Sequence, residues 1–183
     1  GEVPAAADAS TQMQLAHRIA DKVPADAYLS VLGYARVMAR FARRSDIAAA
    51  AAYHMGRGYQ AMNLRADARS AFQTVVSIYR NQIRAAALAA IQLARLDLEA
   101  QLSTPVGESR RRMLIDVGIQ RIMEFIRTGD VVVQARAAIE SARLREAFES
   151  QPDRLMEAVA WLETAVQQSG EHRRLAAEAA VLK

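Results

Sequence analysis

Apolar residues recur along most of the chain at intervals of three and four positions, the spacing that places side chains on one face of an α-helix. Residues 65–81 show it clearly, with Ala68, Phe72, Val75 and Tyr79 on one face. Over the whole chain the pattern predicts nine helices, at residues 10–22, 26–44, 45–62, 65–81, 84–101, 109–127, 131–149, 153–168 and 171–182. Because the connections are short, consecutive helices are expected to be antiparallel, as in a bundle or a solenoid.

The domain organisation follows from the same pattern. Residues 1–9 have no periodic apolar positions and predict a flexible lead-in. Residues 10–183 are expected to form a single helical domain, since a chain of 183 residues suits one core better than two. The segment 102–108 contains Ser-Thr-Pro-Val-Gly, the clearest break in the chain, and is a candidate internal boundary.

Composition agrees with an all-α fold class and excludes several kinds of site. Alanine, the strongest helix former, is abundant, and aromatic residues make up only 5% of the chain. The absence of cysteine excludes disulfides, thiolate metal ligands and cysteine nucleophiles. No uncharged stretch approaches the roughly 18 residues that a membrane-spanning helix needs.

The positive charge is carried almost entirely by arginine. Lys22 and Lys183 are the only lysines among 24 basic residues, and the net charge is +4. Arginine forms bidentate contacts with carboxylates and phosphates, but a base composition that enriches alanine and arginine together explains the bias more simply. Two clusters stand out as a candidate basic patch: Arg36, Arg40, Arg43 and Arg44, and then Arg110, Arg111 and Arg112. Either suits nucleic-acid phosphates or an acidic partner, although nearby aspartates and the lack of interleaved aromatics favour an ordinary solvated surface.

One segment carries a more specific pattern. Met55-Gly56 is followed by Tyr59 in the first of two adjacent helices, and Ala68, Phe72 and Val75 follow in the second. In these spacings, residues 49–82 resemble one tetratricopeptide repeat, a unit of about 34 residues that forms two antiparallel helices. Small residues at 56 and 68 are expected to let the two helices approach closely. The resemblance departs from the family at three positions, Ala52, Asn63 and Arg80, and it does not extend one unit earlier or later.

The resemblance implies an α-solenoid of stacked helix pairs, most of them divergent, because a single repeat cannot bury its own faces. It also implies a concave groove lined by the first helix of each pair. Carried over by position, the groove-facing residues here are Ala50, Tyr53, Arg57 and Gln60, with Ala61 at the edge. Tyrosine and arginine are frequent binding hot spots, and the glutamine amide can bond a peptide backbone. The alternative is a solvated helix face.

The remaining polar residues predict no catalytic or metal site. His17, His54 and His172 are spread along the chain, which makes a zinc site improbable. Glu140 and Arg143 are three positions apart and are expected to support a helix surface. No nucleophile–base arrangement is recognisable, so we expect neither enzymatic activity nor a cofactor.

The resemblance therefore predicts a non-catalytic scaffold or adaptor, of bacterial type, that holds a peptide or helix of a partner protein. The alternatives are a self-assembling structural module and, less favoured, an arginine-rich nucleic-acid-binding protein. The first residue is Gly rather than Met, which is typical of a processed or engineered terminus. On that basis an exported or periplasmic location is slightly favoured over a cytoplasmic one.

Overall fold

The structure is a computed structural model that describes residues 8–22, 27–148, 156, 159–161 and 163. All regular structure within these residues is helical, so the all-α fold class is confirmed. The helices are α1 (Ala9–Lys22), α2 (Ala27–Arg40), α3 (Ser45–Ala61), α4 (Arg65–Ile78), α5 (Ile83–Leu102), α6 (Glu108–Met123), the 3-10 helix η2 (Glu124–Thr128) and α7 (Val131–Phe148). These are eight helical elements, against nine expected helices. The expected helix at 171–182 lies outside the described residues, as does most of the one at 153–168.

Three helices end three or more residues before the expected position, and one of them is α4, which ends at Ile78 rather than at residue 81. α2 ends at Arg40 rather than at residue 44, and a short turn leads into α3. The expected helix 109–127 ends at Met123 and tightens into η2, after which Gly129 adopts a left-handed backbone with φ of 74°. Glycine adopts this conformation without the steric cost that a Cβ would bring, so it closes the turn before α7.

The chain divides into two compact units, residues 1–90 (unit 1) and residues 91–183 (unit 2). The boundary between them falls within α5, whereas the Ser-Thr-Pro-Val-Gly segment forms the connection between α5 and α6. That a single helical-repeat domain spans residues 10–183 stays a prediction.

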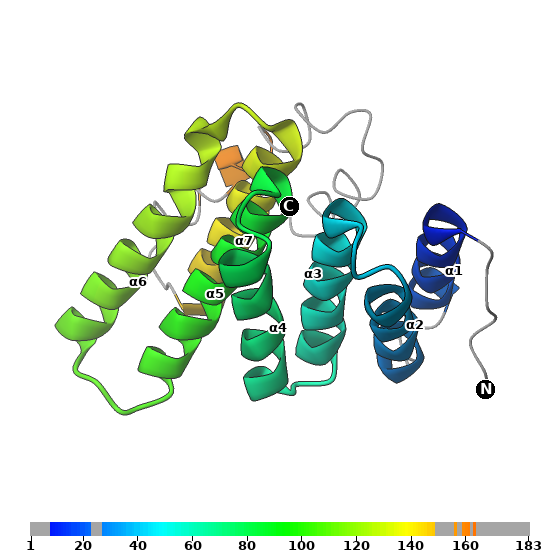
Figure 1. Cartoon of the computed structure of the whole chain (residues 1–183). Coiled ribbons are helices and arrows are strands. Elements are labelled where there is room, and N and C mark those ends of the chain that lie inside the picture. The colour runs from blue at the N-terminus through cyan, green and yellow to red at the C-terminus, as the bar shows by residue number, and fades with distance from the viewer. Residues whose placement is uncertain (1–7, 23–26, 149–155, 157–158, 162, 164–183) are drawn as a thin grey trace. The chain divides into compact units, whose positions relative to one another are not determined.

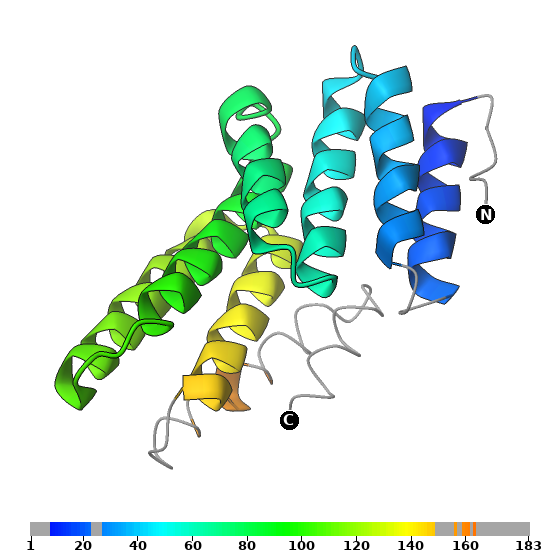
Figure 2. The same ribbon diagram turned by 90° about the horizontal axis from the view of Figure 1, so that it is seen from below.

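In unit 1, helices that are consecutive in sequence pack side by side. α2 packs against both α1 and α3, and α3 packs against α4, as Figures 1 and 2 show. α1 also touches α3, so the first helix of one antiparallel pair contacts the first helix of the next. The interior joining α1, α2 and α3 contains Ala16, Tyr34, Val37 and Ala51, with methionines and Phe41 at its edge.

The α3–α4 pair is held closely together at a glycine. A Cβ added to Gly56 would lie 2.5 Å from Cε1 of Phe72, closer than real Cβ contacts occur. Phe72 and Ala68 are fully buried. This confirms the expectation that position 56 must be small for the two helices to approach. The connecting turn is closed by Asn63, whose φ of 57° lies in the left-handed region that asparagine tolerates.

Unit 2 is organised around α7. Both α6 and η2 pack against α7, and they also contact each other. α5 reaches α6 at Gly118, where an added Cβ would lie 2.6 Å from Cδ2 of Leu98. Every residue of α7 from Ala135 to Ala142 is buried, so this helix has no solvent-facing side over two turns. Its polar residues therefore depend on partners inside the protein, and a polar atom left without one destabilises the fold.

Candidate functional site

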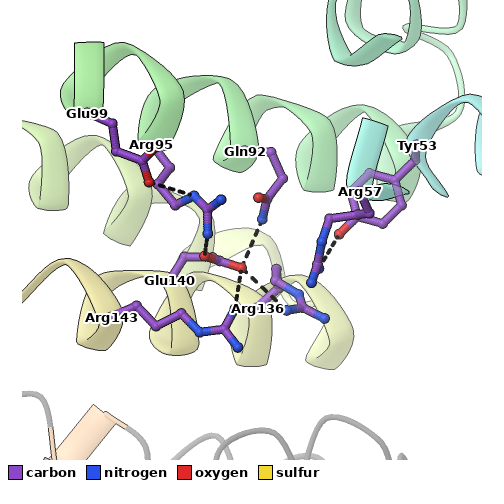
Figure 3. Close-up of polar contacts among 8 residues, drawn as sticks. All are labelled: Tyr53, Arg57, Gln92, Arg95, Glu99, Arg136, Glu140 and Arg143. Atoms are coloured by element: carbon purple, nitrogen blue, oxygen red, sulfur yellow. Dashed lines mark hydrogen bonds and ion pairs between the residues drawn. The ribbon is translucent and has the colours of Figure 1, made fainter. Parts of the chain in front are cut away.

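The residues expected to line a groove lie on one face of α3 in unit 1. Tyr53 is buried, with 6% of its surface exposed, and so it does not present its ring to solvent. Arg57 and Ala50 are half-buried, and Arg57 donates a long hydrogen bond of 3.5 Å from Nη1 to the Tyr53 hydroxyl (Figure 3). The structure thus joins Tyr53 and Arg57, four positions apart, into one contact. Their role in binding stays a prediction.

Gln60, one turn further along the same face, has an unusual environment. Its side-chain oxygen Oε1 and nitrogen Nε2 are both shielded from solvent, and neither has a hydrogen-bond partner in the described part of the chain. An amide has acceptor and donor capacity at these two atoms. Leaving a buried polar group unsatisfied costs about 1–3 kcal/mol. Gln60 is therefore the polar residue on this face whose capacity to form hydrogen bonds is left unused.

An aromatic cluster is centred on His54, next to Tyr53 in α3. The His54 ring lies 5.3 Å from the Tyr53 ring, stacks on Tyr34 at 5.1 Å and meets His17 edge-on at 4.6 Å, measured between ring centroids. The Tyr34 hydroxyl and His17 Nδ1 are 2.8 Å apart and share a hydrogen bond. The cluster ties α1, α2 and α3 together. Sequence reasoning missed it, because nothing local to either histidine indicates that His17 and His54 meet.

The histidine pair does not amount to a metal centre. Within the residues that the structure describes, no group of three or more His, Cys, Asp or Glu side chains is placed to hold a metal ion. The third histidine of the sequence, His172, lies outside those residues.

The first arginine cluster lies in unit 1, at the end of α2 and in the turn that follows. Arg36, Arg40, Arg43 and Arg44 are all exposed. The Arg40 guanidinium lies 5.6 Å from the Phe41 ring centroid, and Arg44 Nη2 pairs with Asp46 Oδ2 at 3.1 Å. This hydrogen bond from Arg44 holds the pKa of the Asp46 carboxyl below its usual value.

The second cluster lies in unit 2, in the first turns of α6. Arg110 is exposed, Arg111 lies 5.7 Å from the Phe148 ring centroid, and Arg112 Nε pairs with Glu108 at 3.1 Å. Two of the three arginines thus already have partners within unit 2.

Several arginines and one glutamine donate hydrogen bonds to a buried carboxylate in unit 2 (Figure 3). Glu140 of α7 is fully buried. Its Oε2 accepts a hydrogen bond from Arg95 at 2.8 Å, and its Oε1 accepts from Gln92 at 3.0 Å. Arg136 and Arg143 each donate to Oε1 at 3.3 Å.

The expectation that Glu140 supports a helix surface was wrong. Residues of α5 cover it, and neither Gln92 nor Arg95 is near it in sequence. Because several donors already occupy both oxygens, the carboxylate is suited to joining α5 to α7 rather than to accepting a proton from a substrate. We interpret this group, together with the Arg145–Asp116 pair at 2.9 Å, as the polar framework of unit 2.

Comparison with known proteins adds no relationship: no family model matches the sequence, and no curated protein or solved structure matches it significantly. The resemblance of residues 49–82 to a tetratricopeptide repeat therefore stays a prediction. Among the described residues, no helix is long and apolar enough to cross a membrane.

Proposed function

We propose that this protein is a non-catalytic helical scaffold that holds an extended segment of a partner protein against the α3 face of unit 1. The observation that carries the proposal is the Gln60 amide, whose two polar atoms are sealed from water without a partner among the described residues. One residue of an extended peptide presents its N–H donor and its carbonyl acceptor on the same side of the chain, so a single residue can satisfy both atoms of the amide.

The neighbours of Gln60 suit the same ligand. Arg57 lies one turn away and brings a planar guanidinium that pairs well with a carboxylate. The buried Tyr53 ring, fixed by His54 and Phe72, supports Arg57 through its hydroxyl, so less conformational entropy is lost when the guanidinium meets a ligand. Arg57 and Gln60 thus provide a charged contact and a backbone-directed amide along one helix face, on a rigid aromatic support.

Binding on this face requires a local rearrangement. Because water does not reach the Gln60 amide, a partner segment must displace the side chains that cover it. The exchange is favoured because it replaces an unsatisfied amide by a hydrogen-bonded one, and this gain offsets part of the ordering cost of the segment.

The test uses Gln60→Met, which keeps the length of the side chain and removes its polar atoms. In the free protein, the variant is expected to unfold at a higher temperature than wild type, since a buried amide without partners has been removed. Peptides selected from a displayed random library on the wild-type protein are expected to bind this variant at least about tenfold more weakly, a loss of one hydrogen-bonded pair.

The matched control is Gln73→Met on the exposed face of α4, which should change neither property. If Gln60→Met lowers the melting temperature, its amide is bonded in the free protein and the argument for a ligand fails. Selected peptides that bind the Gln60 variant as tightly as wild type would also contradict the proposal.

A further inference from the structure

The positive charge of the protein belongs to unit 1. Residues 1–90 contain 11 basic and 6 acidic residues, a net charge of +5, whereas residues 91–183 contain 13 and 14, a net charge of −1. These two values add up to the +4 of the whole chain. The asymmetry is sharper from residue 27 to residue 90, a stretch that contains nine arginines and only two acidic residues, Asp46 and Asp67.

The fold gathers five of these arginines at one end of unit 1. The turn between α2 and α3 and the turn between α4 and α5 lie next to each other, because Gln82 Nε2 donates to Ser45 Oγ at 3.0 Å. Figure 1 shows both turns at the upper end of their helices, with the α3–α4 turn at the opposite end. This basic end carries Arg40, Arg43, Arg44, Arg80 and Arg84, all exposed.

Acidic groups balance only part of this charge. Within residues 40–46 and 78–84 the single acidic residue is Asp46, which pairs with Arg44. The acidic residue before α2 whose side chain the structure describes is Asp8, and its carboxylate already accepts hydrogen bonds from Thr11. Arg43 and Arg80 are joined to no described acidic side chain.

Large apolar side chains protrude beside these arginines. Ile78, the last residue of α4, is 69% exposed, and Ile83, the first residue of α5, is 79% exposed. They flank the turn that contains Arg80, and they are the two most exposed of the large hydrophobic residues among those the structure describes. Singly exposed apolar residues are ordinary, but two large ones that flank an arginine-containing turn give an apolar surface with a charged rim, an arrangement typical of interaction sites.

From this juxtaposition we infer that the basic end docks on a membrane surface that contains anionic lipids. Arginines near an anionic leaflet are attracted to it, and apolar side chains at the same level enter the boundary between headgroups and acyl chains. The turn between α4 and α5 projects Ile78 and Ile83 from helix ends, which suits a flat lipid surface. A nucleic-acid backbone would be met by the arginines alone, since aliphatic side chains neither stack on bases nor pair with phosphates.

The experiment is co-flotation of the full chain with vesicles of phosphatidylcholine, with or without phosphatidylserine. We expect binding only to vesicles with phosphatidylserine, and weaker binding as salt is added. Arg43→Gln/Arg80→Gln should lower the partition coefficient by roughly 25-fold, about fivefold for each arginine. Ile78→Ser/Ile83→Ser should lower it by about tenfold or more through lost apolar contact.

The control is Arg65→Gln/Arg69→Gln, which removes the same charge from the first turns of α4, at the opposite end of that helix. If this control loses as much binding as Arg43→Gln/Arg80→Gln, general positive charge and not the basic end is responsible.

A further experiment measures binding of the protein to two other polyanions, duplex DNA and polyglutamate. If either binds as tightly as the vesicles, and the isoleucine variant retains that affinity for both ligand and vesicles, the end is a polyanion site and the membrane inference is overturned. Because Gln60 is not involved, the Gln60→Met variant should bind vesicles like wild type, which separates this inference from the proposed function.

Discussion

Between its helices unit 1 buries small and apolar side chains, and its polar exceptions among the described residues are Gln12, Ser30 and the side-chain amide of Gln60. Unit 2 buries Arg136, Glu140 and Arg145 in a single helix. Both units bring two helices together at a glycine, yet they depend on different interactions. In unit 1 the limiting quantity is volume, because Gly56 leaves no space for even one methyl group beside Phe72. In unit 2 it is charge, because Glu140 neutralises guanidinium groups that have left water.

The difference shows what each unit tolerates. A core built from small residues accepts polar changes at its edge but no added atoms inside. A buried ionic network adds little net stability when it is complete, because desolvation of the charges offsets their attraction. Removing one partner nevertheless destabilises the protein strongly, since a buried charge is left uncompensated. The following substitutions test this contrast, in order of decreasing expected effect.

Glu140→Ala should be the most destabilising. The substitution leaves Arg95 and Arg136 without the carboxylate that neutralises them, and breaking a buried pair costs about 3–5 kcal/mol. The measurement is the free energy of unfolding by urea. Glu146→Ala, at an exposed position of the same helix, is the control and should be nearly neutral. Equal changes in the free energy of unfolding at the two positions would show that the buried network does not contribute more to stability than an exposed glutamate does.

Gly56→Ala should destabilise by about 1–3 kcal/mol, since its methyl group would overlap the buried Phe72 ring. Gly118→Ala in unit 2 makes the same change against Leu98, whose flexible side chain can turn away, and should cost only about 1 kcal/mol. Thermal unfolding of both variants tests the order. If Gly118→Ala proves the more damaging, volume is not the distinguishing limit of unit 1.

Ser141→Ala is expected to stabilise by up to about 1 kcal/mol. The Ser141 hydroxyl is buried and has no hydrogen-bond partner among the described residues, and alanine is also the better helix former. Ser70→Ala at an exposed site of α4 controls for helix propensity alone. Melting temperatures of the two variants would separate these contributions. A loss of stability in Ser141→Ala would mean that its hydroxyl belongs to the polar framework of unit 2.

The smallest expected effect is that of Asp46→Asn, because the Arg44–Asp46 pair is exposed and screened by solvent. The folded-state pKa of Asp46 lies below its ordinary value of 3.8, so the pair stabilises the protein above that value. This contribution is lost as the pH falls through the lowered folded-state pKa. Wild type should therefore melt slightly above the variant at neutral pH, and the gap should close in acid. A gap that persists in acid would assign the effect to something other than the carboxylate charge.

The helices and the α3–α4 contact could be predicted from the sequence because both depend on local spacing. A period of three to four residues identifies a helix wherever it occurs, and Gly56 and Phe72 lie in adjacent helices joined by a short turn. The environment of Glu140 could not be predicted in this way. The i,i+3 spacing of Glu140 and Arg143 is the same whether the pair lies on a surface or in a core. Glu140 is buried because α5 packs over it, and this contact is not visible in the local sequence.

The candidate site was predicted only in part. The resemblance to a tetratricopeptide repeat implied that Tyr53, Arg57 and Gln60 share one face, but the burial of Tyr53 depends on its surroundings in three dimensions. The same applies to the rings of His17, Tyr34 and His54, which come from three helices. The basic end combines a cluster visible in the sequence, at Arg43 and Arg44, with Arg80 and Arg84, which only the Gln82–Ser45 contact brings alongside.

The sequential packing of α1 to α4 also has a kinetic meaning. Contacts between neighbouring helices join residues that are close in the chain, so little loop-closure entropy is lost before they form. Helical proteins of such low contact order reach the native state in microseconds to milliseconds. The α3–α4 pair, with its turn already shaped by Asn63, is suited to form first and to act as a template on which α2 and then α1 assemble. A substitution at Gly56 would then slow refolding, whereas one in α1 would mainly speed unfolding.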